Sequence, residues 1–211
     1  MNRPQLEHII RAAAGNADTT EIVVIGSQAI LGTYPDAPDD LLVSMEADVF
    51  PRDRPQDSIL IDGGIGERSI FHETFGYYAH GVDETTATLP EGWRERLVPI
   101  RNENTRGATG WCLEVHDLAV SKLIAGREKY LAYIAALFRH RPASPETVRE
   151  RLGKTALPPA SFDAARLGAW LHGRAAEIAI FHGTRSDESL TATDLFDTLG
   201  EAFKQLRAVC F

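Results

Sequence analysis

The chain has 211 residues, of which 44% are hydrophobic and 25% charged, a composition typical of a globular protein and not of a disordered, collagen-like or coiled-coil chain. Its 30 acidic and 22 basic residues give a net charge of −8, which argues against a protein that coats nucleic acid through bulk electrostatics. Apolar runs fall well short of the about 20 residues that a membrane-spanning helix needs, and no apolar leader follows Met1. We therefore expect a cytoplasmic protein with no membrane contact. Cys112 and Cys210 are expected to be free thiols.

The hydrophobic pattern predicts a mixed α/β region of about 140 residues that is followed by helices. Apolar residues at helical spacing between Leu6 and Ala13 indicate an N-terminal helix. A short helix is predicted at 28–32, and residues 56–75 are expected to be helical in part. Runs rich in β-branched and aromatic residues predict strands at 21–25, 41–50, 77–83, 97–101 and 111–115.

The strongest helical pattern is predicted to begin at a cap formed by His116 and Asp117 and to continue to Phe138. Arg127 falls in a gap of the apolar stripe of this helix. A buried guanidinium is costly unless a carboxylate or a phosphate compensates its charge. We therefore expect Arg127 either to pair with an acid in the core or to contact a phosphate.

Proline-rich breaks separate this helix from the C-terminal part of the chain. Ser144 and Pro145 indicate a new helix start. Two further amphipathic helices are predicted at about 163–181 and 189–209. We therefore predict a mixed α/β domain at residues 1–141 and a helical C-terminal region, residues 142–211, that packs on it.

The first candidate for a functional site is the end of the strand predicted at 21–25. There the strand stops at Gly26, and a helix opens at once with Ser27. Glycine allows a close approach of the backbone to a ligand, and free N–H groups with a serine hydroxyl suit a phosphate. An ordinary tight turn with a capping serine is the alternative interpretation.

The second candidate is a pair of carboxylates, Glu46 and Asp48, on the strand predicted at 41–50. Side chains alternate along a strand, so both carboxylates point to the same face. They repel each other unless a cation or a proton lies between them. Oxygen ligands at this spacing suit Mg²⁺, which also takes waters and substrate phosphates as ligands. A solvent-exposed strand face is the alternative, which the apolar neighbours of the pair disfavour.

The two features together resemble the nucleotidyltransferase superfamily of the polymerase β type. Its pattern is a strand, Gly-Ser or Gly-Gly, a short helix, and then a strand that carries two carboxylates. Residues 88–97 and 114–129 are similar to a bacterial branch related to the abortive-infection AbiEii toxins. The resemblance covers about residues 20–140. In this chain Glu46 stands where the family usually has Asp, and Tyr130 stands where an Asp often follows the lysine.

The resemblance implies a nucleotidyltransferase-like mixed sheet flanked by helices, with residues 1–141 as the catalytic domain. It also implies one or two Mg²⁺ ions held by Glu46, Asp48 and a third carboxylate on a neighbouring strand. Asp83 is the best candidate for that carboxylate, and a turn residue is the alternative interpretation of it. The other candidates are Glu84, Glu114 and Asp117. The nucleotide would be bound by Gly26, Ser27, Lys122, Arg127 and Lys129.

The expected function is therefore Mg²⁺-dependent transfer of a nucleoside monophosphate from an NTP to an acceptor. RNA such as a tRNA, a protein hydroxyl and a small molecule are the acceptor classes left open. The alternative is an inactive binding module of the same fold in a toxin–antitoxin or regulatory system, with a cognate antitoxin as its partner. A metal-dependent phosphohydrolase is a third interpretation. The helices of the C-terminal region are expected to help choose the acceptor.

Overall fold

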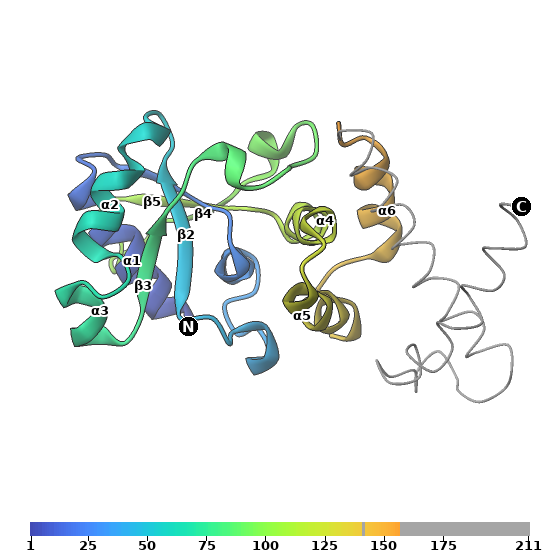
Figure 1. Cartoon of the computed structure of the whole chain (residues 1–211), viewed down its shortest axis with the longest axis horizontal. Helices are drawn as coiled ribbons and strands as arrows, with labels where there is room; N and C mark the ends of the chain where they lie inside the picture. The colour runs from blue at the N-terminus through green and yellow to red at the C-terminus, as the bar shows by residue number, and fades with distance from the viewer. Residues whose placement is uncertain (141, 157–211) are drawn as a thin grey trace, which may run out of the picture.

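The computed structural model describes residues 1–140 and 142–156, whose centre is a five-stranded sheet of order β3-β2-β1-β5-β4 (Figure 1). The central strand β1 pairs antiparallel with β2 and parallel with β5. β2 pairs parallel with β3, and β4 pairs antiparallel with β5. The strands are β1 (Glu21–Val24), β2 (Glu46–Pro51), β3 (Tyr78–Gly81), β4 (Val98–Ile100) and β5 (Thr109–Cys112). The predicted mixed α/β class is confirmed.

Helices flank this sheet: α1, α2 and α3 pack on it, and α4, α5 and α6 lie together beside it (Figure 1). The α-helices are α1 (Arg3–Asn16), α2 (Ser58–Ile65), α3 (Ile70–Phe75), α4 (Val115–Ala125), α5 (Glu128–Arg139) and α6 (Pro145–Gly153). The 3₁₀ segments are η1 (Ser27–Gly32), η2 (Asp39–Leu41), η3 (Pro55–Asp57), η4 (Glu84–Thr86) and η5 (Trp93–Arg96). Among residues 1–140 and 142–156, no helix is long and apolar enough to cross a membrane.

The N-terminal helix α1 packs on the sheet through the apolar residues that predicted it. Leu6, Ile9 and Ile10 are fully buried. Asn2 and Gln5 form a capping box that satisfies the first free N–H groups of the helix. The approach of helix and sheet is close, because a Cβ atom on Gly110 of β5 would lie 2.3 Å from Ile10 Cδ1. This packing fixes β1 and β5, and with them the sheet that carries the candidate site.

Two predicted strand boundaries differ from the structure by three residues or more. Residues 41–45 do not join β2, which begins at Glu46. Val43 is 76% exposed, so the apolar run that predicted a strand there is not a buried one. Residues 113–115 do not belong to β5, because Glu114 caps α4 by accepting a hydrogen bond from the His116 backbone N–H. The cap of α4 therefore lies two residues before the predicted one, and His116 and Asp117 lie in the first turn of the helix.

The long helix predicted from residue 116 to 138 is two helices, and this changes the position of Arg127. Gly126 ends α4 in the left-handed conformation, with φ of 60°, and its N–H is directed at the carbonyls of Lys122 and Leu123. Arg127 then caps α5 and is exposed, with its guanidinium 5.6 Å from the ring centre of Tyr130. The prediction that Arg127 lies in a buried apolar seam is wrong, because the break at Gly126 ends the periodicity on which it depended.

Helix α6 begins as predicted, with the Ser144 hydroxyl accepting a hydrogen bond from the Thr147 backbone N–H. Its residues Val148 and Leu152 belong to the hydrophobic core, and Arg151 forms ion pairs with two acids of the α4 segment. The described part of the predicted C-terminal region thus packs on α4. The helices predicted at 163–181 and 189–209 lie outside the described residues, and the two-part domain organisation stays a prediction.

Candidate active site

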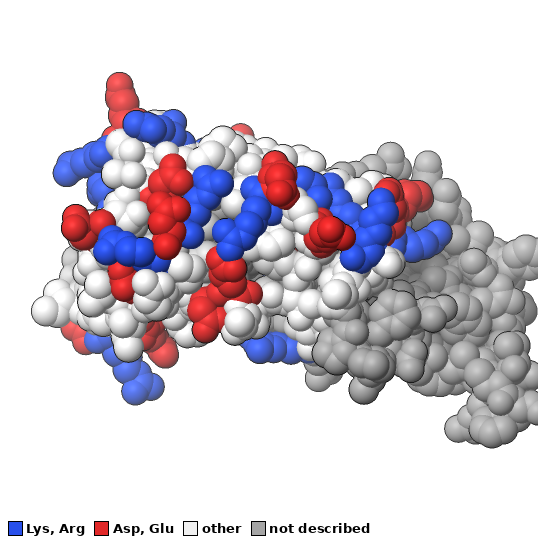
Figure 2. Space-filling model, turned by 90° about the horizontal axis from the view of Figure 1, so that it is seen from above, with Lys and Arg blue, Asp and Glu red and all other residues white. Residues whose placement is uncertain are grey.

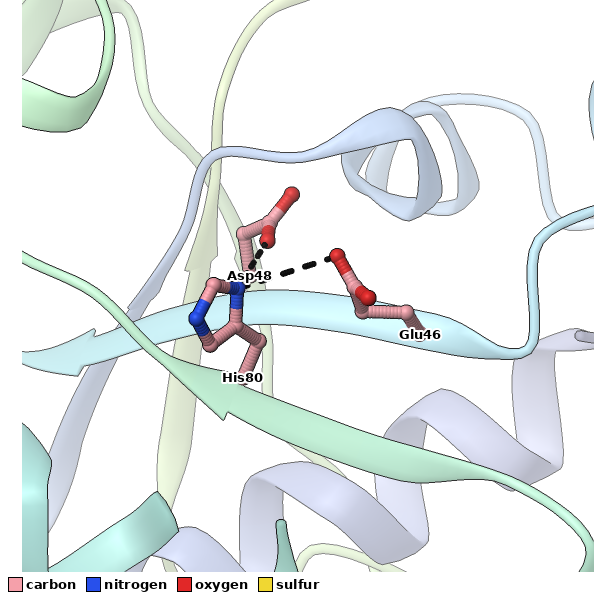
Figure 3. A group of neighbouring side chains, drawn as sticks. All are labelled: Glu46, Asp48 and His80. Carbon is pink, nitrogen blue, oxygen red and sulfur yellow. Dashed lines mark ion pairs between the residues drawn. The ribbon is translucent and has the colours of Figure 1, made fainter. Parts of the chain in front are cut away.

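The two carboxylates that the sequence singled out lie on one face of β2. Glu46 and Asp48 alternate with the buried residues Ala47 and Val49, so their side chains leave the core on the same side. In the parallel pairing with β3, Asp48 lies opposite His80. Figure 3 shows the imidazole of His80 turned toward both carboxylates.

These three side chains form a compact group of potential metal ligands. His80 Nδ1 lies 3.3 Å from Asp48 Oδ1 and 3.8 Å from Glu46 Oε1. One donor atom from each residue lies within 4.8 Å of the others. Burial, together with the nearby Glu46, raises the pKa of the Asp48 carboxyl to about 6, while His80 opposes the shift. The site therefore disfavours two bare negative charges and favours a cation between them.

Tyr78 holds one of the two carboxylates in place. Its position in β3 is opposite Glu46, and its hydroxyl donates a hydrogen bond of 2.8 Å to Glu46 Oε2. Burial, together with the hydrogen bond to Glu46, raises the pKa of Tyr78, so its hydroxyl stays a donor. Neither Tyr78 nor His80 was predicted from the sequence. Their alternation within the strand predicted at 77–83 was the available signal, but only the register of β3 on β2 shows which acids they face.

The turn after β1 brings Gly26 against Asp48. The Ile25 N–H donates a hydrogen bond of 3.0 Å to the Asp48 carbonyl, which carries the antiparallel pairing to the end of the strand. A Cβ atom on Gly26 would lie only 2.1 Å from Asp48 Oδ2. The backbone of Gly26 has an ordinary φ of −78°, so the glycine is needed for space and not for its conformational freedom.

Lys122 of α4 contacts the same turn at Ser27. Its Nζ donates a hydrogen bond of 2.7 Å to Ser27 Oγ, and it lies 4.0 Å and 4.6 Å from the ring centres of Tyr130 and Tyr133. The hydroxyl of Tyr133 donates to the Ser27 carbonyl at 2.7 Å. Burial lowers the pKa of Lys122 to about 8, and the negative charge of Asp48 opposes that shift. A positive charge is thus held at the Gly26–Ser27 turn.

Two other predicted nucleotide-binding residues lie on the exposed side of this cluster. Arg127 Nη1 donates to the Tyr130 hydroxyl at 3.3 Å, and Lys129 Nζ lies 5.5 Å from the ring centre of Tyr130. Both side chains are exposed. They surround the aromatic ring that covers Lys122, and their contact with a nucleotide stays a prediction.

The structure does not bring Asp83 to the carboxylate pair. β3 ends at Gly81, and Asp83 caps η4 by accepting hydrogen bonds from the backbone N–H and the hydroxyl of Thr85. These bonds lower the pKa of its exposed carboxyl. The residue of β3 that lies opposite Asp48 is His80, whereas Asp83 lies beyond the end of this strand.

The three other candidates for the third carboxylate form ion pairs. Glu84 pairs with Arg94, while Glu114 and Asp117 both pair with Arg151. These contacts give each acid a structural role outside the Glu46–Asp48 group.

The structure has the arrangement that the nucleotidyltransferase resemblance implies. Two carboxylates on one strand of a mixed sheet lie beside a Gly-Ser turn, and a lysine contacts that turn. The model of the family described as a nucleotidyltransferase of unknown function (DUF6036) matches residues 4–152, and the chain belongs to this family. No curated protein and no solved structure matched the chain in the corresponding comparisons. The predicted class of enzyme is confirmed. The closer similarity to the AbiEii toxins stays a prediction.

Proposed function

We propose that the protein transfers a nucleoside monophosphate from an NTP to an acceptor hydroxyl with the help of a divalent metal ion, in the cytoplasm. The observation that carries the proposal is the contact of Gly26 with Asp48. It joins the carboxylate pair of β2 to the turn that holds Ser27 and Lys122. A metal-binding group and a phosphate-binding group therefore share one site.

The residues present fit a divalent cation. Glu46 and Asp48 offer the hard oxygen ligands that Mg²⁺ prefers, and the raised pKa of Asp48 reflects the repulsion and burial that a cation would relieve. Tyr78 fixes the direction of the Glu46 carboxylate through one of its oxygens. One or two bound Mg²⁺ ions would polarise the α-phosphate and stabilise the leaving pyrophosphate.

Ser27 and Lys122 are proposed to bind the triphosphate. The two tyrosine rings hold Lys122 Nζ beside the serine hydroxyl, so the charge is in place before a nucleotide arrives. With a pKa of about 8, this lysine is mainly charged at neutral pH, and a phosphate beside it would favour the charged form further. Arg127 and Lys129 are proposed to extend this positive region outward.

The charge distribution favours a small or structured acceptor over long duplex DNA. On the face seen in Figure 2, basic and acidic side chains of the described residues are interspersed. Arg94 and Arg96 form ion pairs with Glu84 and Asp117. A tRNA, a protein hydroxyl and a small molecule are proposed as the acceptor classes to test first, and a cognate antitoxin as a protein partner.

Calorimetry of the full chain with each NTP, with and without Mg²⁺, tests the proposal. We expect nucleotide binding that requires the metal. Incubation with α-labelled NTPs and fractionated cell extract should then show which fraction takes up the label.

Absence of metal-linked nucleotide binding with Mn²⁺ as well as with Mg²⁺ would overturn the proposal and favour the inactive binding module. Release of inorganic phosphate without transfer of label would favour a phosphohydrolase.

A further inference from the structure

We propose that His80 is the third protein ligand of the metal site and that the site consequently prefers Mn²⁺ to Mg²⁺. The inference rests on the proposed function, because it concerns the same site. It goes beyond that function in two respects: it adds a histidine to the two carboxylate ligands, and it names the class of metal ion that the site prefers.

The position of His80 in the sheet supports its role as a ligand. It lies opposite Asp48 in the register of β3 on β2, on the strand where the resemblance requires a third ligand. Its Nδ1 faces both carboxylates, 3.3 Å from Asp48 Oδ1 and 3.8 Å from Glu46 Oε1 (Figure 3). An ion within reach of one oxygen from each acid is therefore also within reach of this nitrogen.

The surroundings of His80 distinguish it from a histidine that packs the core. Its side chain is 52% exposed, while its neighbour in β3, Ala79, is fully buried. The ring therefore contributes little apolar packing, and its contacts with the two acids are polar.

The donor set decides which ion is favoured. Mg²⁺ is a hard cation that takes oxygen ligands and loses its waters reluctantly, so an imidazole nitrogen adds little to its binding. First-row transition ions accept imidazole, and Mn²⁺ also suits carboxylate and water ligands. Two carboxylates and one imidazole, completed by water or phosphate oxygens, match Mn²⁺ on both counts.

Electron paramagnetic resonance of Mn²⁺ titrated into the full chain without nucleotide tests the proposal, with Mg²⁺ added as a competitor. We expect Mn²⁺ to bind at least about tenfold more tightly than Mg²⁺. Spin-echo modulation from a coordinated nitrogen should be present in the wild type and absent in His80→Ala. This variant should bind Mn²⁺ at least about tenfold more weakly. His80→Asp, which gives an all-oxygen set, should narrow the difference between the Mn²⁺ and Mg²⁺ affinities and lack the nitrogen signal.

His140→Ala is the matched control, because His140 Nε2 lies 3.0 Å from Asp40 Oδ2 in a histidine–carboxylate pair outside the site. It should leave both the Mn²⁺ affinity and the nitrogen modulation unchanged. Mn²⁺ binding that is equal in wild type and His80→Ala, or that lacks the nitrogen signal, would overturn the inference and leave the proposed function standing. Failure of the wild type to bind either ion, with or without an NTP, would overturn the proposed function itself.

Discussion

Replacing Gly26 by alanine is expected to disable the site without unfolding the protein. The added Cβ would lie 2.1 Å from Asp48 Oδ2, whereas such contacts essentially never fall below 3.0 Å. The carboxylate must therefore retreat by about 0.9 Å. A misplacement of about 1 Å in an active site can cost about 100-fold in rate, and we expect a loss of that order in nucleotide transfer. The backbone of Gly26 is in a region open to alanine, so stability should change little.

Gly15→Ala is the matched control, because a Cβ there meets nothing within 4 Å and the residue lies inside α1. This variant should keep full activity and gain about 0.5–1 kcal/mol of stability, since alanine is the better helix former. Transfer of α-label and metal-linked NTP binding are measured for both variants, and thermal melting checks that each is folded. Wild-type turnover in a folded Gly26→Ala protein would refute the argument that this close approach positions Asp48.

Three further substitutions probe the site and its support. Asp48→Asn should stay folded, and its metal affinity measured by calorimetry should fall at least about 100-fold, because the amide lacks the charge. An unchanged affinity would show that Asp48 is not a metal ligand. Tyr78→Phe should weaken metal binding about 10-fold by freeing the carboxylate it holds, whereas Tyr77→Phe, which loses a hydrogen bond outside the site, should not. Arg151→Met should lower the free energy of unfolding in urea by about 3 kcal/mol, because it removes a partner of the fully buried Asp117; an unchanged midpoint and slope would contradict this.

Local sequence patterns predicted the residues that lie at strand ends and on strand faces. Gly26 and Ser27 follow from a β-branched run that stops at a glycine. Glu46 and Asp48 follow from the alternation of side chains along a strand, which does not depend on the exact strand boundary. The error at residues 41–45 therefore did not affect the prediction that the two carboxylates share a face.

Residues whose position depends on pairing between strands could not be predicted in this way. His80 faces Asp48 only because β3 pairs with β2 in one particular register, and a shift by one residue would turn it to the other face. Asp83 is the last residue of the strand predicted at 77–83, but β3 ends at Gly81 and Asp83 lies beyond it. Arg127 was misplaced because Gly126 was treated as a residue inside one helix, although its left-handed conformation ends α4.

The two longer stretches of resemblance, residues 88–97 and 114–129, meet in the structure through a buried charge. Asp117 is fully buried, and it accepts hydrogen bonds from Arg96 Nε at 2.8 Å and Nη2 at 3.1 Å. Arg151 of α6 donates to the same carboxylate at 2.9 Å. A buried carboxylate without such partners costs several kcal/mol, so Asp117 ties η5 and α6 to α4. Lys122, which contacts the Gly26–Ser27 turn, is also on α4. The ion pairs of Asp117 therefore help to position the helix that carries this lysine, although Asp117 lies outside the metal site.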